Sequence, residues 1–166
     1  VDPADPYRLS DGEASLMASL VGAFRRSPAL RRHIEFLYTC GSLYRVCNGN
    51  LLFHGCIPLC ADGSFDTVRT FDGQSLAGRA YMDFCDRTAR AAFYDGGQNE
   101  LDFMYYLWCG RQSPLFGRSR MTTFERYFVS DCSAWEEVKN PYYDLVVEYP
   151  AAAAILREFG LNERSA

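Results

Sequence analysis

The amino-acid sequence predicts an α+β fold in which helices predominate, and three observations lead to this prediction. Two helix-start signals stand close together near the N-terminus, at Ser10 and at Ser27-Pro28. An Asn48-Gly49 dipeptide, typical of a two-residue β-turn, separates two short β-type segments. Later stretches carry apolar residues at helical spacing. We expect a helical hairpin, then a short β-hairpin or sheet segment, then further helices.

The first 41 residues divide into a lead-in and a helical pair. Residues 1–9 are acidic and Pro-rich, and are expected to be linker-like. Ser10 and Glu13 have the spacing of a capping box, in which the two residues satisfy free backbone N–H groups at a helix start. Pro28 fits the first position of a second helix. Residues 10–41 are therefore predicted to form a helical hairpin.

Residues 42–73 are predicted to be rich in β-structure. The segments Leu43–Cys47 and Leu51–Phe53 flank the turn as the two strands of a hairpin. His54 therefore stands at the end of the second strand, directly before a glycine. A third strand is expected within Phe65–Phe71.

Residues 74–166 are predicted to be mainly helical. Apolar side chains recur at helical spacing over 75–94. The apolar run 101–108 is expected to be a buried helix that places Trp108 in the core. Thr122–Glu125 has the spacing of a second capping box and is predicted to open another helix.

Composition and charge narrow the class of protein. The 166 residues are 48% hydrophobic and 23% charged, which is typical of a globular domain. The net charge of −4 argues against nucleic acid or an acidic membrane as a partner, because both attract a basic footprint. No apolar run approaches the ~20 residues of a membrane-spanning helix. The seven cysteines include no C-x-x-C pair and do not resemble a disulfide framework, so reduced thiols in a cytoplasmic protein are expected.

Two histidines are the first candidates for chemistry. His33 falls among charged residues of a predicted helix, and a solvated surface position is expected for it. His54, at a strand end, is either a metal ligand or a structural histidine on spacing alone. It also belongs to a loose cluster with four cysteines, Cys40, Cys47, Cys56 and Cys60. Zinc sites more usually contain C-x2-4-C pairs, so zinc is the less favoured interpretation.

Several strings of residues together point to a known family. The segment His54-Gly55-Cys56-Ile57-Pro58 resembles the H-G-x-x-P segment of the calcineurin-like metallophosphatases. Four further strings extend the resemblance, at 100–110 (ELDFMYYLWCG), 113–117 (SPLFG), 121–128 (MTTFERYF) and 139–143 (KNPYY). With these strings, nearly the whole chain resembles the class III, Mn-dependent fructose-1,6-bisphosphatases of bacteria.

The resemblance implies a role in gluconeogenesis. Members hydrolyse fructose 1,6-bisphosphate to fructose 6-phosphate and phosphate by a two-metal mechanism. One site residue carries over, His54 as a metal ligand, with Mn²⁺ as the expected ion and a sugar bisphosphate as the expected partner. The superfamily's other metal motifs, D-x-H, G-D-x-x-D-R, G-N-H-[DE] and a downstream G-H, do not occur in this sequence. We therefore expect an internal or C-terminal-half piece of a larger four-layer metallophosphatase, with no catalytic residue of its own and inactive in isolation.

Arginines around the 110–117 loop are candidates for substrate binding. Arg111 and Arg118, with Arg120 and Arg126 following, could form an anion-binding rim for sugar phosphate, because guanidinium groups match phosphate oxygens. A solvated charged loop is the competing interpretation.

Two other functions stay open at this point. A piece of a different calcineurin-like phosphatase, acting on phosphoprotein or dinucleotide, would share the His54 motif. A non-catalytic α+β interaction module would instead bind its partner through exposed aromatic residues such as Tyr142 and Tyr143. If the chain is a piece of a longer protein, uncovered apolar surface is expected to make it self-associate.

Overall fold

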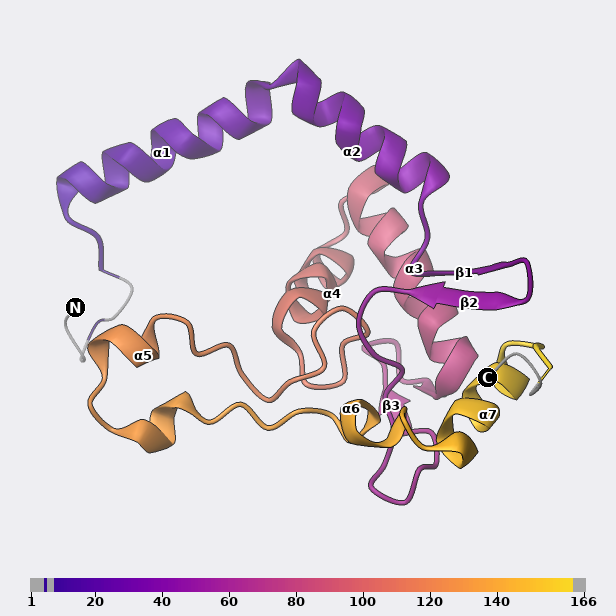
Figure 1. Cartoon of the computed structure of the whole chain (residues 1–166). Coiled ribbons are helices and arrows are strands. Elements are labelled where there is room, and N and C mark those ends of the chain that lie inside the picture. The colour runs from indigo at the N-terminus through magenta and orange to yellow at the C-terminus, as the bar shows by residue number, and fades with distance from the viewer. Residues whose placement is uncertain (1–4, 6–7, 163–166) are drawn as a thin grey trace. The chain divides into compact units, whose positions relative to one another are not determined.

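The chain divides into two units, Val1–Gly41 and Ser42–Ala166. The structure, a computed structural model, describes Asp5 and residues 8–162 (Figure 1). The predicted linker at residues 1–9 lies largely outside the described residues.

The first unit consists of two helices, α1 (Asp11–Arg26) and α2 (Pro28–Cys40). The predicted capping box opens α1, since the Ser10 backbone N–H donates to the Glu13 carboxylate at 2.8 Å. Ser27 ends α1 and caps α2, where its hydroxyl accepts from the backbone N–H of Leu30 at 3.2 Å.

These two helices do not form the antiparallel hairpin that the sequence predicted. Only Ser27 separates them, whereas a helical hairpin needs a loop of about two to five residues to reverse the chain. The helices instead meet at a corner (Figure 1), and neither contains a buried residue. Their amphipathic faces are therefore uncovered within this unit.

A β-hairpin begins the second unit. Strands β1 (Tyr44–Cys47) and β2 (Asn50–Phe53) pair antiparallel, with Tyr44 opposite Phe53. The turn between them takes positive φ values at Asn48 (52°) and Gly49 (79°), the backbone that an Asn-Gly dipeptide favours. The predicted hairpin is therefore confirmed.

The remaining β-structure is shorter than predicted. Strand β3 covers only Val68–Arg69 and pairs with β4 (Ser75–Leu76), which the sequence had assigned to a helix. Phe65 contributes an isolated bridge to Leu59 in place of a third long strand.

Helices make up most of the rest of the second unit, which confirms the α+β class. The long helices are α3 (Gly78–Tyr94) and α4 (Gln98–Cys109), which pack against each other through Phe84 and Phe103 at a ring-centroid distance of 5.3 Å. The shorter elements are α5 (Glu125–Phe128), the 3-10 helix η1 (Cys132–Trp135), α6 (Tyr142–Leu145) and α7 (Tyr149–Glu158). No helix among the described residues is long and apolar enough to cross a membrane.

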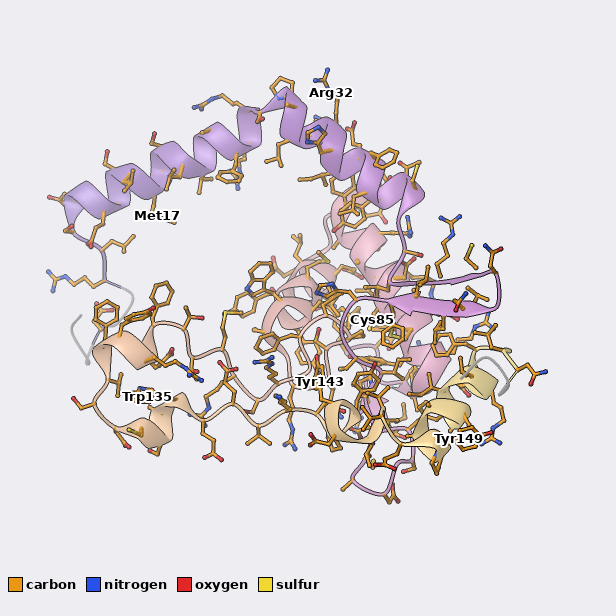
Figure 2. The ribbon with its side chains drawn as sticks, viewed as in Figure 1. Met17, Arg32, Cys85, Trp135, Tyr143 and Tyr149 are labelled. Carbon is orange, nitrogen blue, oxygen red and sulfur yellow. The ribbon has the colours of Figure 1, made fainter. Side chains whose placement is uncertain are left out.

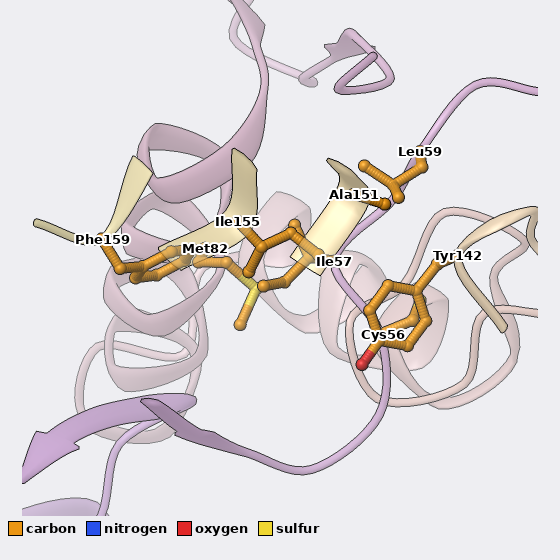
Figure 3. Packing of buried hydrophobic residues seen from close by; sticks show 8 residues of the cluster. All are labelled: Cys56, Ile57, Leu59, Met82, Tyr142, Ala151, Ile155 and Phe159. Carbon is orange, nitrogen blue, oxygen red and sulfur yellow. The ribbon is translucent and has the colours of Figure 1, made fainter. Parts of the chain in front are cut away.

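Two buried clusters form the core of the second unit, and α3 contributes to both. The first joins α3 and α7 to the segment after β2, with Met82 against Ile155 and Phe159 and Tyr142 beside Cys56 (Figure 3). The second lies between α3 and α4; its members are Val68, Tyr81, Phe84, Cys85, Phe103 and Leu107. Leu43 packs against both clusters, so the start of the hairpin is fixed to the whole core.

Candidate functional site

His54 lies where the second strand of the hairpin ends and the chain enters the core. Strand β2 stops at Phe53, whose ring packs on Tyr142 with centroids 6.0 Å apart. His54 itself is exposed, while the next residues, Cys56 to Leu59, are buried. The imidazole therefore lies at the surface, between Phe53, which packs on Tyr142, and a buried segment that begins at Cys56.

The segment after His54 is packed against the loop between α4 and α5. The backbone N–H of Cys56 donates to the carbonyl oxygen of Pro114 at 2.9 Å. A Cβ at Gly55 would lie 2.2 Å from that same oxygen, so no larger residue fits without moving backbone. The glycine after the histidine is therefore required by this contact.

The 113–117 loop is itself tightly fixed. Ser113 and Pro114 are fully buried, and the Ser113 hydroxyl donates to the Leu107 carbonyl at the end of α4. Gly117 has a φ of +60°, and a Cβ there would meet the Cys56 sulfur at 2.5 Å. The loop and the His54 segment can therefore approach this closely only with glycine on each side.

Asn140 joins these two segments to a third. Its side-chain oxygen accepts hydrogen bonds from the backbone N–H groups of Leu59 (3.1 Å) and Tyr142 (3.0 Å), and its own N–H donates to the Gly117 carbonyl at 2.8 Å. It is only 2% exposed. Three of the strings that suggested the family, separated by dozens of residues in sequence, thus form one buried polar network behind His54.

Cys56 is an internal thiol of this network and is not available as a metal thiolate. Its sulfur donates to the Ser113 carbonyl at 3.4 Å. Burial raises the pKa of the Cys56 thiol to about 12, although a hydrogen bond with the Tyr143 hydroxyl opposes the shift. The thiol therefore stays protonated at neutral pH.

The described residues do not by themselves fit a metal centre. No group of three or more His, Cys, Asp or Glu side chains able to hold an ion occurs among residues 8–162. The loose Cys/His cluster therefore forms no such group among the described residues; Cys40 and Cys47 are exposed, and Cys56 is buried. One imidazole cannot hold a two-metal site, which needs several ligands for each ion.

The arginines predicted as an anion-binding rim are divided between different environments. Arg118 donates from Nη1 to the Glu137 carboxylate at 2.7 Å. Arg111 is exposed in the loop and Arg126 is exposed in α5. The anion-binding rim stays a prediction, with Arg118 the one of the four that forms an ion pair among the described residues.

Residues 118–139 form an arm that starts directly from the 113–117 loop. Its two ends are joined by a bridge between Arg118 and Lys139, and Figure 1 shows the arm extending to α5 and η1. Trp135 lies in the outer part of the arm (Figure 2). Its indole N–H donates to the carbonyls of Glu125 (2.9 Å) and Val129 (3.0 Å). The arm thus has internal order of its own.

The predicted capping box at the start of α5 is wrong. The Thr122 hydroxyl bonds to the Glu137 carboxylate at 2.8 Å and to the Trp135 carbonyl at 3.2 Å instead of capping a helix. The helix begins only at Glu125, after an uncapped Phe124. A partner 15 residues away has taken the side chain that the local pattern assigned to the helix start.

The exposure of two further residues, Trp108 and His33, was predicted from the sequence, once wrongly and once correctly. Trp108 is 70% exposed, so the prediction that it is core is wrong. On α4 the buried face passes through Phe103 and Leu107, and Trp108 falls one residue beyond it. His33 is exposed on α2, as predicted.

A charged cleft of about 560 Å³, not predicted from the sequence, lies between β1 and α3. Three arginines line it, Arg45, Arg79 and Arg87, together with Asp83 and Asp86. The available signal was the i, i+4, i+8 spacing of 79, 83 and 87, which puts alternating charges on one helix face. Sequence alone could not show that β1 closes the other side.

Comparisons with known proteins match nearly the whole chain to fructose-1,6-bisphosphatases. Residues 1–166 match the family model described as Firmicute fructose-1,6-bisphosphatase. A class 3 fructose-1,6-bisphosphatase of Clostridium novyi is 46% identical over 98% of this chain and 25% of its own length. One of Pediococcus pentosaceus is 44% identical over 99% of this chain and 26% of its own length. The chain therefore spans about a quarter of these curated relatives. No solved structure shows significant similarity to it.

Proposed function

Because this chain belongs to the Firmicute fructose-1,6-bisphosphatase family, we propose that it forms part of an enzyme that hydrolyses fructose 1,6-bisphosphate to fructose 6-phosphate and phosphate. The observation that carries the proposal is the family match over all 166 residues. Since the chain spans about a quarter of the curated relatives, the activity is assigned to a longer polypeptide of which this sequence supplies one part.

The buried network behind His54 supports this assignment. Gly55, Pro114 and Asn140 belong to three of the strings that carry the family resemblance. Hydrogen bonds join these segments, from the Cys56 N–H to Pro114 and from the Asn140 N–H to Gly117. Such a network fixes the backbone on the C-terminal side of His54. A side chain that must hold one position in an active site needs support of this kind.

The family suggests a metal cofactor, and we assign His54 as one of its ligands. The ion we propose is Mn²⁺, for which imidazole and carboxylate ligands are suitable. The ligands other than His54 would come from outside this sequence, because the described residues hold no further ligand group. No catalytic residue is assigned within the chain.

Arg111 and Arg118 are proposed to contact the sugar bisphosphate. Arg111 is exposed in the loop that packs behind His54. Arg118 uses Nη1 for Glu137, and its side chain is 41% exposed, so its other guanidinium donors can still reach an anion. A cytoplasmic location belongs to the same proposal, because the substrate is an intracellular sugar phosphate.

The alternative functions receive less support. A binding module that uses Tyr142 would need this ring at the surface, but it is only 7% exposed and belongs to the core. A phosphoprotein or dinucleotide phosphatase would leave unexplained the match of the entire chain to a fructose-1,6-bisphosphatase family.

A chimera tests the proposal directly. Residues 1–166 would replace the matched segment of the Clostridium novyi relative, and release of phosphate from fructose 1,6-bisphosphate with added Mn²⁺ would be measured. We expect the chimera to be active, the isolated chain to be inactive, and His54→Ala to reduce the chimera's kcat by at least about a hundredfold. His33→Ala, an exposed histidine on α2, is the matched control and should leave the rate unchanged.

An inactive but folded chimera would contradict the proposed function. A fully active His54→Ala chimera would leave the function standing and overturn the assignment of His54 as a ligand.

A further inference from the structure

The cleft between β1 and α3 has the dimensions of a small-molecule site. Its volume of about 560 Å³ lies within the range typical of ligand pockets. Its lining comes from β1 and the segment before it, from α3, and from Phe159 at the end of α7. All of its lining residues belong to the second unit.

The two carboxylates of the cleft are already engaged. Asp86 accepts from Arg90 at 2.7 Å and from the backbone N–H of Leu43 at 3.1 Å. Asp83 accepts from the Tyr44 hydroxyl at 2.7 Å and lies 3.8 Å from the Arg79 guanidinium. Each carboxylate thus has a cation close by, Arg79 for Asp83 and Arg90 for Asp86.

Two guanidinium groups in the same cleft have no such partner. Arg45 and Arg87 form no ion pair or side-chain hydrogen bond with any other described residue. With Arg79, three guanidinium groups therefore line one cleft of a protein whose net charge is −4. A recessed site with low-dielectric walls focuses the positive potential of such groups on a small anion.

The walls of the cleft are fixed in position. The Tyr44 ring packs edge-on against Phe159 at a centroid distance of 4.7 Å, and its hydroxyl also accepts from Arg79 Nε at 3.1 Å. The backbone N–H of Arg79 is held in turn by the Glu158 carboxylate at 3.0 Å. The Tyr44 hydroxyl, the Asp83 carboxylate and Arg79 are therefore pre-positioned, which lowers the cost of ordering them around a ligand.

We propose that this cleft binds a phosphorylated sugar, with Arg45 and Arg87 on the phosphate and the Asp83 and Asp86 carboxylates accepting from sugar hydroxyls. Guanidinium groups match the oxygen geometry of phosphate and often bind it with two parallel hydrogen bonds. A carboxylate has about four lone-pair sites, so Asp83 and Asp86 can accept from hydroxyls while keeping their present partners.

Phosphate binding follows from the cleft alone, whereas the choice of a sugar phosphate rests on the proposed function. The strand register places Tyr44 opposite Phe53, the residue directly before His54, so the cleft and the His54 segment share one hairpin. The same chemistry would serve the phosphate of the substrate that is not cleaved or a separate sugar phosphate that regulates the enzyme.

Binding to the chain itself is the test, measured by calorimetry with fructose 6-phosphate, inorganic phosphate and fructose as probes. We expect fructose 6-phosphate to bind more tightly than inorganic phosphate, and fructose not to bind. Arg45→Gln and Arg87→Gln should each raise the Kd of fructose 6-phosphate by roughly tenfold, the effect of losing one charged hydrogen bond. Arg69→Gln, an exposed arginine of β3 outside the cleft, removes the same charge and should leave Kd unchanged.

Three results would overturn the proposal: no binding of either phosphate probe, equal losses in Arg69→Gln and the cleft variants, or full affinity in a double Arg45→Gln/Arg87→Gln variant. Thermal unfolding of each variant confirms that it is folded, which is expected because both side chains are exposed. In the chimera, Arg87→Gln raises KM if the cleft holds the substrate, and alters only inhibition by added fructose 6-phosphate if it holds an effector. Because binding to the chain is measured without turnover, an inactive chimera would contradict the proposed function but not the proposed binding site in the cleft.

Discussion

Asn140 shows how much of this structure depends on a single buried side chain. One amide oxygen serves two backbone donors from different segments, and no water-exposed alternative is available to either donor. A buried donor without an acceptor costs about 1–3 kcal/mol, more than a typical hydrogen bond contributes when made. The stability of the network behind His54 therefore depends strongly on the Asn140 side chain.

Asn140→Ala is expected to lower the free energy of unfolding by about 2–4 kcal/mol, because the N–H groups of Leu59 and Tyr142 would both lose their acceptor. Urea denaturation of the chain measures the change. Asn99→Ala, at an exposed position in α4, is the control and should cost less than about 0.5 kcal/mol. Equal midpoints for the two variants would show that the amide does not support the network.

At the scale of single residues, the sequence predicted positions better than contacts. The strand end at His54 followed from an Asn-Gly turn and a short apolar run, which are local signals. That Gly55 is needed because Pro114 lies behind it depends on a contact between distant segments, and no local pattern carries it. The same reason explains why Arg45 and Arg87 were not recognised as neighbours.

At the scale of elements, capping signals succeeded where nothing distant competed for the side chain. Ser10 with Glu13 opened α1 as predicted, and the hydrogen bonds of both side chains are with each other's residue. Thr122 has equally good local spacing, but its hydroxyl is taken by Glu137, and α5 starts without a cap. A sequence signature for a helix start therefore holds only while its residues remain free to cap.

The arm at residues 118–139 is expected to lose stability in acid. Hydrogen bonds from Arg118 and then from Thr122 lower the pKa of Glu137 from 4.5 to about 2. A carboxylate with a depressed pKa stabilises the fold fully above its unfolded value, so this contribution is complete above about pH 4.5 and is lost as the pH falls towards 2.

Glu137→Gln tests this expectation through the arm's own fluorophore. In a Trp108→Phe background, Trp135 is the remaining one of two tryptophans and reports on the arm. The wild-type arm should become less stable to urea between pH 5 and 2, and Glu137→Gln should change less over that range. Glu136→Gln, which alters an exposed neighbour, should follow the wild type. Parallel curves for wild type and Glu137→Gln would contradict the assigned role of the pair.

At the scale of the whole molecule, much apolar surface is uncovered within each unit. Neither α1 nor α2 contains a buried residue, and in the arm Phe124, Tyr127 and Phe128 are 73%, 80% and 77% exposed. Exposed apolar patches of this kind mark surfaces that contact another polypeptide. In the proposed function, the remaining three quarters of the longer polypeptide is the natural partner.

The isolated chain is therefore expected to self-associate, and the arm to contribute. A Phe124→Ser/Tyr127→Ser/Phe128→Ser variant should shift the mass from light scattering towards the 18.8 kDa of one chain and bind less hydrophobic dye. Val147→Ser, an equally exposed apolar residue outside the arm, should have a smaller effect. A monodisperse wild-type chain that binds no dye would refute the expectation.

The two core clusters each contain one buried cysteine, Cys56 in the first and Cys85 in the second. Burial raises the pKa of both thiols to about 12, so neither reacts with alkylating reagents at neutral pH unless its surroundings open. The rate at which each thiol is alkylated therefore reports how often the core cluster around it opens. If both thiols are alkylated at the same rate, the two clusters open together as one cooperative unit. If the rates differ, one cluster opens locally while the other stays closed.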